Sequence, residues 1–286
     1  MCPTKRVVEM ALVGIQDIPT LPSVFQQTQQ LLHSEKTSAQ DIAKIISEDL
    51  SLTTKILKSA NSAYYSTGNV RVSSIQQAIV RLGFNEICRL CSFLAIVEKF
   101  KGMGKNLDHA NFWKHSLASG LTAQYIHRLV GKDTGVDDND LYVAGLLHDL
   151  GILIMDQFFP QQFTQITEQF DKTKERYDQV ELDILGMDHA EIGAYLLDQW
   201  NIPVLVGQSV LHHHRYREAE PAYAYTAAVI HVAEVLCSNH NLRHRLDPPV
   251  RPLEEDAIAQ ARLNPALLQK VEKFVDEKAV HCDISL

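Results

Sequence analysis

The chain has 286 residues, of which 45% are hydrophobic, so it can bury the core of one large domain or of two ordinary ones. Its net charge of −8 argues against a general nucleic-acid-binding protein, because such proteins carry a basic surface. It has no uninterrupted apolar run of transmembrane length, no recognisable signal peptide and five scattered cysteines, so we expect a cytoplasmic protein with reduced thiols and no membrane association.

Helical spacing of apolar residues dominates the first hundred residues. In 38–60 the apolar positions recur every three or four residues, and Ser38 begins a sequence that resembles a capping box. The pattern repeats in 74–82, which ends at Gly83, and an apolar helix follows in 85–100. The pair Cys88 and Cys91 falls inside that helix, where a free cysteine packs as a small hydrophobic residue.

The glycine-containing stretch 101–108 is the best internal boundary, and a second break follows at 245–252. The polar stretch 161–183 is interpreted as a solvated helical surface. Further helices are expected at 109–130, 139–158, 160–176, 188–200, 203–214, 222–240 and 263–280. The pattern predicts an all-α protein with an N-terminal helical bundle packed on a second helical domain, divided as 1–105, 106–245 and a C-terminal helical extension in 246–286.

The segment YVAGLLHDLGIL, residues 142–153, is apolar almost all round, which is typical of a buried helix. His148 and Asp149 interrupt it side by side. A buried carboxylate must be paired or bound to a metal, because an isolated buried charge costs several kcal/mol or more. Taken alone, this pair is equally compatible with a structural hydrogen bond.

Other histidines and one acid occupy comparable positions. His115 lies among apolar residues in NFWKHSLASG, and His189 follows the predicted N-cap Asp188. A protonated imidazole is disfavoured at a helix N-terminus, whereas the neutral ring that a metal requires is tolerated there. A run of three histidines, 212–214, ends the next helix, and Glu234 is the single acid in AAVIHVAEVLC.

Imidazole and carboxylate ligands suit iron, manganese or zinc, which we expect to bind as one divalent ion or as a pair. Asp149 could bridge two such ions. Two ions about 3.5–4 Å apart can hold a hydroxide against a phosphorus centre and stabilise the leaving oxygen.

The order H … HD … H … HH … E resembles the HD superfamily of metal-dependent phosphohydrolases, whose central motif is similar to GLLHDLG. DHAEIGAYLLDQWNIP followed by LHHH resembles the HDOD branch, as do IPTLPSVFQQTQQLL, KILKSANSAYYS and VSSIQQAIVRLGFNEI near the N-terminus. The resemblance covers roughly residues 15–240. It implies an N-terminal helical HDOD subdomain and an HD-type helical domain, in a branch commonly viewed as bacterial regulatory or interaction modules.

The resemblance also implies a set of metal ligands, with Asp149 as the catalytic residue if the protein is an enzyme. The double histidine of the family falls on His213 and His214, or on His212 and His213 in the other register. The acid that ends the set is usually aspartate and is Glu234 here. The implied ligands are His115, His148, Asp149, His189, His213, His214 and Glu234.

Three departures from the family pattern bear on activity. The DGxGYP loop of the HD-GYP branch, which hydrolyses cyclic-di-GMP, is replaced by RYREAEPAY after the histidine run. Asn111 stands where some members have an acid, and Leu50 stands where proline is frequent. The first two departures weigh against hydrolysis of cyclic-di-GMP.

Three functional hypotheses follow. The first is a metal-binding signal-transduction module that acts through a signalling protein partner or a nucleotide-type ligand. The second is an active phosphohydrolase or phosphodiesterase that acts on a nucleotide or cyclic nucleotide. The third is a purely structural site in which the histidines pack without metal. The remaining histidines are interpreted as surface or ordinary core residues: His33, His109, His127, His231, His240, His244 and His281.

Overall fold

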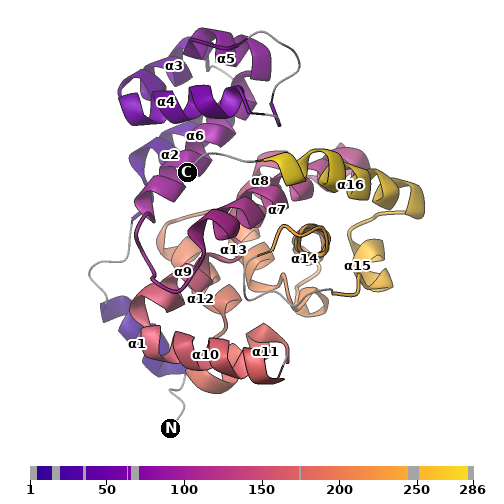
Figure 1. Cartoon of the computed structure of the whole chain (residues 1–286). Coiled ribbons are helices and arrows are strands. Elements are labelled where there is room, and N and C mark those ends of the chain that lie inside the picture. Colours follow the sequence, from indigo (N-terminus) through magenta and orange to yellow (C-terminus); the bar gives the residue numbers. More distant parts are fainter. Residues whose placement is uncertain are drawn as a thin grey trace. The chain divides into compact units, whose positions relative to one another are not determined.

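The computed structural model describes residues 5–14, 20–34, 37–62, 64–65, 71–173, 175–243 and 251–282. All regular secondary structure in these ranges is helical, which confirms the expected all-α class (Figure 1). The chain forms two compact units. Unit 1 comprises Met1–Ile18 with Gly102–Val280, and unit 2 comprises Pro19–Lys101 with His281–Leu286.

Unit 2 is built around its longest helix, α6, which contacts the four others. Its helices are α2 (Ser23–Leu32), α3 (Ala39–Ser47), α4 (Leu50–Ala60), α5 (Ile75–Leu82) and α6 (Phe84–Lys99). Cys88 and Cys91 are both buried in α6, in agreement with the prediction that they pack as core residues. Burial raises the pKa of the Cys88 thiol to about 12, which leaves it protonated and unreactive at neutral pH.

The predicted helix in 38–60 is two helices, α3 and α4. The capping box at Ser38 is present, as the sequence predicts. The sequence pattern did not predict that a second helix begins after Asp49. The Oδ1 atom of Asp49 accepts a hydrogen bond from the Leu52 backbone N–H at 3.0 Å. This acid caps α4 and therefore ends one helix and begins the next.

Unit 1 consists of α1 and all helices after residue 102. They are α1 (Lys5–Gly14), α7 (His109–Val130), α8 (Asp138–Leu147), α9 (Leu150–Phe158), α10 (Pro160–Thr173), α11 (Tyr177–Leu185), α12 (His189–Gln199), α13 (Val204–Leu211), α14 (Ala224–Asn239), α15 (Glu255–Gln260) and α16 (Pro265–Glu277). Short 3₁₀ turns occur at Lys132–Thr134, Tyr216–Glu218 and Ala279–His281. Helix α7 packs on α8, and α14 packs on both.

Two segments group differently from the predicted division at 105 and 245. Helix α1 belongs to unit 1, where Lys5 pairs with Glu191 of α12. The predicted C-terminal extension as far as Val280 also belongs to unit 1, because α15 packs on α14 and α16 packs on α7, whereas His281–Leu286 group with unit 2. Helices α15 and α16 are therefore part of the unit that contains the predicted metal ligands.

The predicted continuous helix over 139–158 is wrong. The structure has α8, a turn at His148 and Asp149, and then α9. Asp149 has φ −98° and ψ 8°, outside the helical region, so the chain bends at the polar pair. The segment Asp138–Phe158 is long and apolar enough to cross a membrane by length and composition, but 89% of its most apolar window is buried inside the fold.

Glycines allow the helices around this turn to approach closely. A Cβ added to Gly145 would lie 2.7 Å from the Cα of Gly120, where α8 crosses α7. A Cβ added to Gly151 of α9 would lie 2.0 Å from the carbonyl oxygen of His189 in α12. Side chains other than hydrogen would separate these helices, so the glycines bring the first residues of the histidine pattern together.

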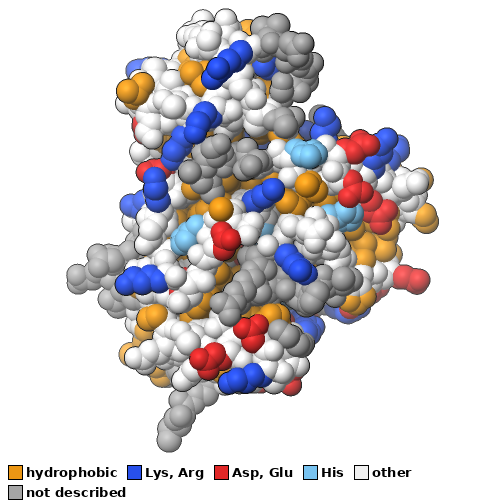
Figure 2. Space-filling model, viewed as in Figure 1, with side chains coloured by type: hydrophobic (Ala, Val, Ile, Leu, Met, Phe, Trp, Pro, Cys, Tyr) orange, Lys and Arg blue, Asp and Glu red, His pale blue; other side chains and the backbone are white. Residues whose placement is uncertain are grey.

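Charge is distributed unevenly between the units. Residues 19–101 hold nine Lys or Arg and six Asp or Glu, so the negative net charge of the chain comes from the rest of the sequence. Figure 2 shows blue side chains following the helices of unit 2, whereas basic and acidic side chains alternate on the visible face of unit 1. The expected absence of general nucleic-acid binding thus rests on the charge of the whole chain rather than on each unit.

Candidate metal centre

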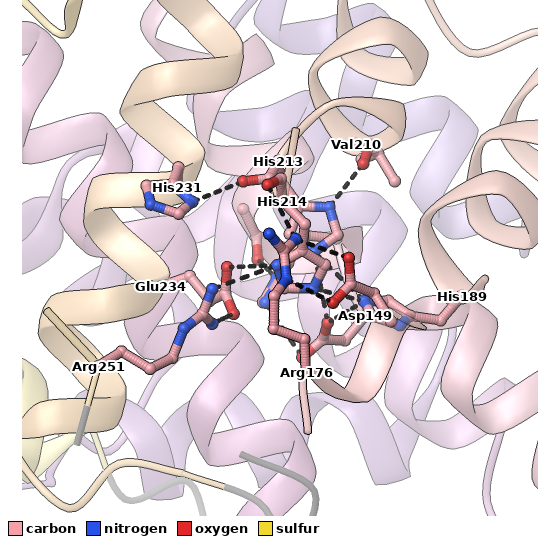
Figure 3. A network of polar contacts seen from close by, with 12 residues as sticks. Asp149, Arg176, His189, Val210, His213, His214, His231, Glu234 and Arg251 are labelled. Carbon is pink, nitrogen blue, oxygen red and sulfur yellow. Dashed lines mark hydrogen bonds and ion pairs between the residues drawn. The ribbon is translucent and has the colours of Figure 1, made fainter. Parts of the chain in front are cut away.

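The structure brings all the predicted ligands together inside unit 1. His115 comes from α7, His148 and Asp149 from the turn between α8 and α9, and His189 from the first position of α12. The others follow α13 or lie in α14. Figure 3 shows Asp149, His189, His213, His214 and Glu234 close to one another. Within each of three overlapping groups, one ligand atom per residue lies within 4.8 Å of the others: Asp149, His189, His213 and His214; His115, His148 and Asp149; and His148, His213 and Glu234.

Asp149 is at the centre of this arrangement. Its Oδ2 lies 3.5 Å from His115 Nε2 and 3.1 Å from His148 Nε2. Its Oδ1 lies 3.5 Å from His189 Nε2 and 3.8 Å from His213 Nε2. Each carboxylate oxygen therefore faces a different pair of imidazoles, which is the arrangement that a carboxylate bridging two ions requires.

Four imidazoles are oriented by an acceptor on the Nδ1 side. The acceptors are backbone carbonyls for three rings and a carboxylate for the fourth. Because these oxygens only accept, each Nδ1 carries the hydrogen, and Nε2 is the atom left to bind an ion. The pairs are His115 with Leu242 O at 2.6 Å, His148 with Gly145 O at 2.8 Å, His213 with Val210 O at 2.6 Å, and His189 with Glu181 Oε2 at 2.6 Å.

The Nε2 atoms also lie close to one another. His115 and His148 are 3.1 Å apart at these atoms, His189 and His213 are 3.3 Å apart, and His189 and His214 are 2.9 Å apart. In two neutral rings with hydrogen on Nδ1, the Nε2 lone pairs would point at each other and repel. A proton or a cation between the two Nε2 atoms removes this repulsion. The donor set and its crowding therefore fit a divalent cation.

His213 and His214 are the members of the histidine run that enter this centre, and His212 is in none of the three groups. Of the two registers left open by the sequence, the structure thus supports His213 with His214. Burial, followed by the neighbouring imidazoles, holds the pKa values of His213 and His214 well below the usual range. Both rings are therefore neutral, as a metal ligand must be.

Glu181 is a residue of the site that was not predicted from the sequence. It lies in α11, within the polar stretch predicted to be solvated, yet it is completely buried. Its Oε2 accepts from both the backbone N–H of His189, at 2.9 Å, and the ring Nδ1–H. A hint in the sequence is the apolar Val180 and Leu185 on the same short helix, which are also buried.

Glu181 changes the expected protonation of His189. Burial opposes a charge on this ring, but the carboxylates of Glu181 and Asp149 outweigh burial and raise the pKa of His189 to about 10. Asp188 is the N-cap as predicted and forms a capping box with Glu191, yet the expected preference of the helix N-terminus for a neutral ring is overridden. Without metal, the His189 ring is protonated and positively charged, and a metal ion would replace the additional proton.

Replacing Glu181 by Gln is expected to weaken metal binding about 10–100-fold, which is the usual effect of losing an outer carboxylate that orients a ligand histidine. The amide keeps the size of the side chain but removes the charge that holds His189. Manganese titration by calorimetry measures the effect. Asp183→Asn is the matched control, since Asp183 is exposed on the same helix; equal affinities for the two variants would contradict the role of Glu181.

Comparison with known proteins identifies the family. The HDOD domain matches residues 18–216 of this chain. A protein of Treponema pallidum (strain Nichols), named only as uncharacterized, is 29% identical over 216 residues, which are 73% of this chain and 40% of that protein. The chain thus matches less than half of the length of that relative.

Solved structures share the fold. An HDOD domain protein of unknown function from Geobacter sulfurreducens is 24% identical, with a TM-score of 0.83 and coverage of 96% of this chain and 95% of that one. A Marinobacter aquaeolei VT8 protein, provisionally named for signal transduction, is 20% identical with a TM-score of 0.78, covering 94% of this chain and 60% of its own. A Shewanella amazonensis SB2B protein, provisionally named a phosphohydrolase, is 21% identical with a TM-score of 0.73, covering 95% and 96%.

Proposed function

This chain belongs to the HDOD domain family, and on that premise we propose that it is a metal-binding signal-transduction module that acts through a protein partner or a nucleotide-type ligand. The observation that carries the proposal is Asp149, whose two oxygens face two separate pairs of imidazoles. The nitrogen and oxygen donors favour iron, manganese or zinc. We place the protein in the cytoplasm, as its reduced thiols suggest.

Burial supports a regulatory role over catalysis. Asp149 is 2% exposed and His115, His148 and His213 are completely buried, so a bulky substrate has little access to the bridging carboxylate. The loop that accompanies cyclic-di-GMP hydrolysis is also absent from the sequence after the histidine run. The structural likeness to a protein provisionally named for signal transduction is consistent with this proposal.

Phosphohydrolysis is the second candidate. A pair of bound divalent ions would supply Lewis-acid activation of water or of a phosphoryl oxygen. The chain's own contribution would be to hold Asp149 between the two imidazole pairs and to keep Nε2 of each ring available. The observation that favours this candidate is the complete ligand set, which many regulatory members of the family lack.

Metal analysis of protein purified without chelator, followed by hydrolysis assays with manganese, iron or zinc, tests the proposal. We expect bound metal. We expect the rate of hydrolysis of a chromogenic phosphodiester or of cyclic nucleotides to be no higher than the rate in buffer alone. Metal-dependent turnover would favour the enzyme. Protein that neither retains nor takes up metal would support the third hypothesis, in which the histidines only pack, and would contradict the proposed function.

A further inference from the structure

Residues 251–256, which we name the strap, are fixed at both ends against unit 1. At the first end, the Arg251 backbone N–H donates to Asn239 Oδ1 at 2.9 Å and its carbonyl accepts from Asn239 Nδ2 at 2.8 Å. At the other end, the Tyr216 hydroxyl donates to Glu254 Oε2 at 2.6 Å and contacts Asp256 Oδ1 at 2.8 Å. Arg217 also pairs with both of these acids. The strap is therefore a built element of the fold.

The strap directs one guanidinium group to the edge of the candidate metal centre. Arg251 Nη1 donates to Glu234 Oε1, and Arg251 Nη2 lies 3.3 Å from His214 Nδ1 (Figure 3). The Arg251 side chain is 18% exposed, whereas that of Glu234 is 1% exposed. The Arg251 guanidinium group thus points inward and pairs with the buried carboxylate of Glu234.

Glu234 belongs at the same time to a group that could hold a metal ion, with His148 and His213. A buried carboxylate requires a counter-charge, which a guanidinium or a divalent ion can supply equally well. Two cations beside one buried carboxylate repel each other strongly, because the surroundings have a low dielectric constant. Arginine cannot relieve this repulsion by losing its proton.

We propose that Arg251 is an internal competitor of the metal ion that would bind at Glu234, and that the strap sets the strength of this competition. The inference rests on the metal site put forward in the proposed function. While the strap is docked, the position that uses Glu234 with His148 and His213 binds metal weakly, and the position that uses Asp149 with His189 and His214 fills first. Undocking of the strap frees Glu234 and allows the second ion to bind.

Manganese titration of the full chain by calorimetry tests this inference, with Arg251→Gln as the principal variant. The parent is expected to bind a second ion at least about tenfold more weakly than this variant, which corresponds to about 1.4 kcal/mol. Arg217→Ala loosens the far end of the strap without altering the metal centre and should shift affinity in the same direction by a smaller factor. Arg128→Gln removes a surface arginine paired with Asp138 and is the matched control, with no expected change.

A second readout is the metal-induced rise in melting temperature, which should be larger for Arg251→Gln because metal then supplies the counter-charge that Arg251 supplied to Glu234. If the parent and Arg251→Gln bind the second ion with equal affinity, this inference is wrong, while the proposed function is unaffected. Weaker metal binding by both strap variants would also overturn it and would make Arg251 a support of the centre. If no protein binds metal, the inference and the proposed function fail together.

Discussion

Replacement of Asp149 by Ala is expected to lower metal affinity by more than about 100-fold, because loss of an outer supporting residue alone costs about 10–100-fold. Asp149, like His148 and His213, belongs to two of the three ligand groups, and its two oxygens face separate pairs of imidazoles, so its removal disrupts both of its positions together. Metal content after dialysis, measured by elemental analysis, is the readout. Asp149→Asn is a companion variant that keeps the volume of the side chain and removes its charge.

The fold should survive this change, as judged by the helical circular dichroism signal. Burial opposes a positive charge on His148, and Asp149 raises the pKa of that ring by stabilising its charged form. The variant loses this interaction, so we expect the metal-free protein to be somewhat less stable. Asp198→Ala, at an exposed position of α12, controls for the loss of an acid. Retention of metal by the Asp149→Ala protein would contradict the bridging role of this carboxylate.

The same variant distinguishes the two candidate functions. If the protein is an enzyme, hydrolysis by the metal-loaded parent should fall to background in Asp149→Ala. If it is a signalling module, the parent should show no hydrolysis with any metal, and the substitution should act only on stability or on partner binding. Robust turnover by the parent that this substitution abolishes would overturn the preference for signalling.

The sequence was sufficient to predict the helical class and the residues that converge at the site. The reason is physical: polar residues such as His148 and Asp149 interrupt helices that are otherwise apolar, so burial and polarity conflict visibly in the pattern. The family resemblance then supplied the order of the set. The double histidine was assigned to His213 and His214 because the apolar Val210 and Leu211 precede them, with His212 and His213 as the alternative register.

The residues that were missed lie where the pattern is weak. Glu181 lies in the stretch 161–183, in which polar residues predominate, so periodicity indicates solvent, although tertiary packing buries it beside His189. Arg251 follows a proline-rich break without periodic apolar positions, and its contact with Glu234 depends on chain path rather than on local sequence. The turn at His148 and Asp149 was missed because both flanking segments are equally apolar.

Replacement of Gly151 by Ala is expected to have the largest effect on stability, because the new Cβ would lie 2.0 Å from the backbone carbonyl oxygen of His189. A backbone atom cannot rotate away as a side chain can, so α9 and α12 must separate. Overpacking of this kind usually costs about 1–3 kcal/mol and occasionally more, and we expect the upper end of that range. Chemical denaturation followed by circular dichroism measures it.

Gly207→Ala is the matched control for this prediction. Gly207 lies inside α13, and a Cβ there would meet nothing within 4 Å, so the substitution should be neutral or stabilise by up to about 1 kcal/mol. Because His189 begins α12, its shift in Gly151→Ala should move Nε2 away from Asp149 and weaken metal binding as well as folding. A Gly151→Ala protein as stable as the parent, with unchanged metal affinity, would contradict the close approach of α9 and α12, and with it the placement of His189 beside the bridging carboxylate.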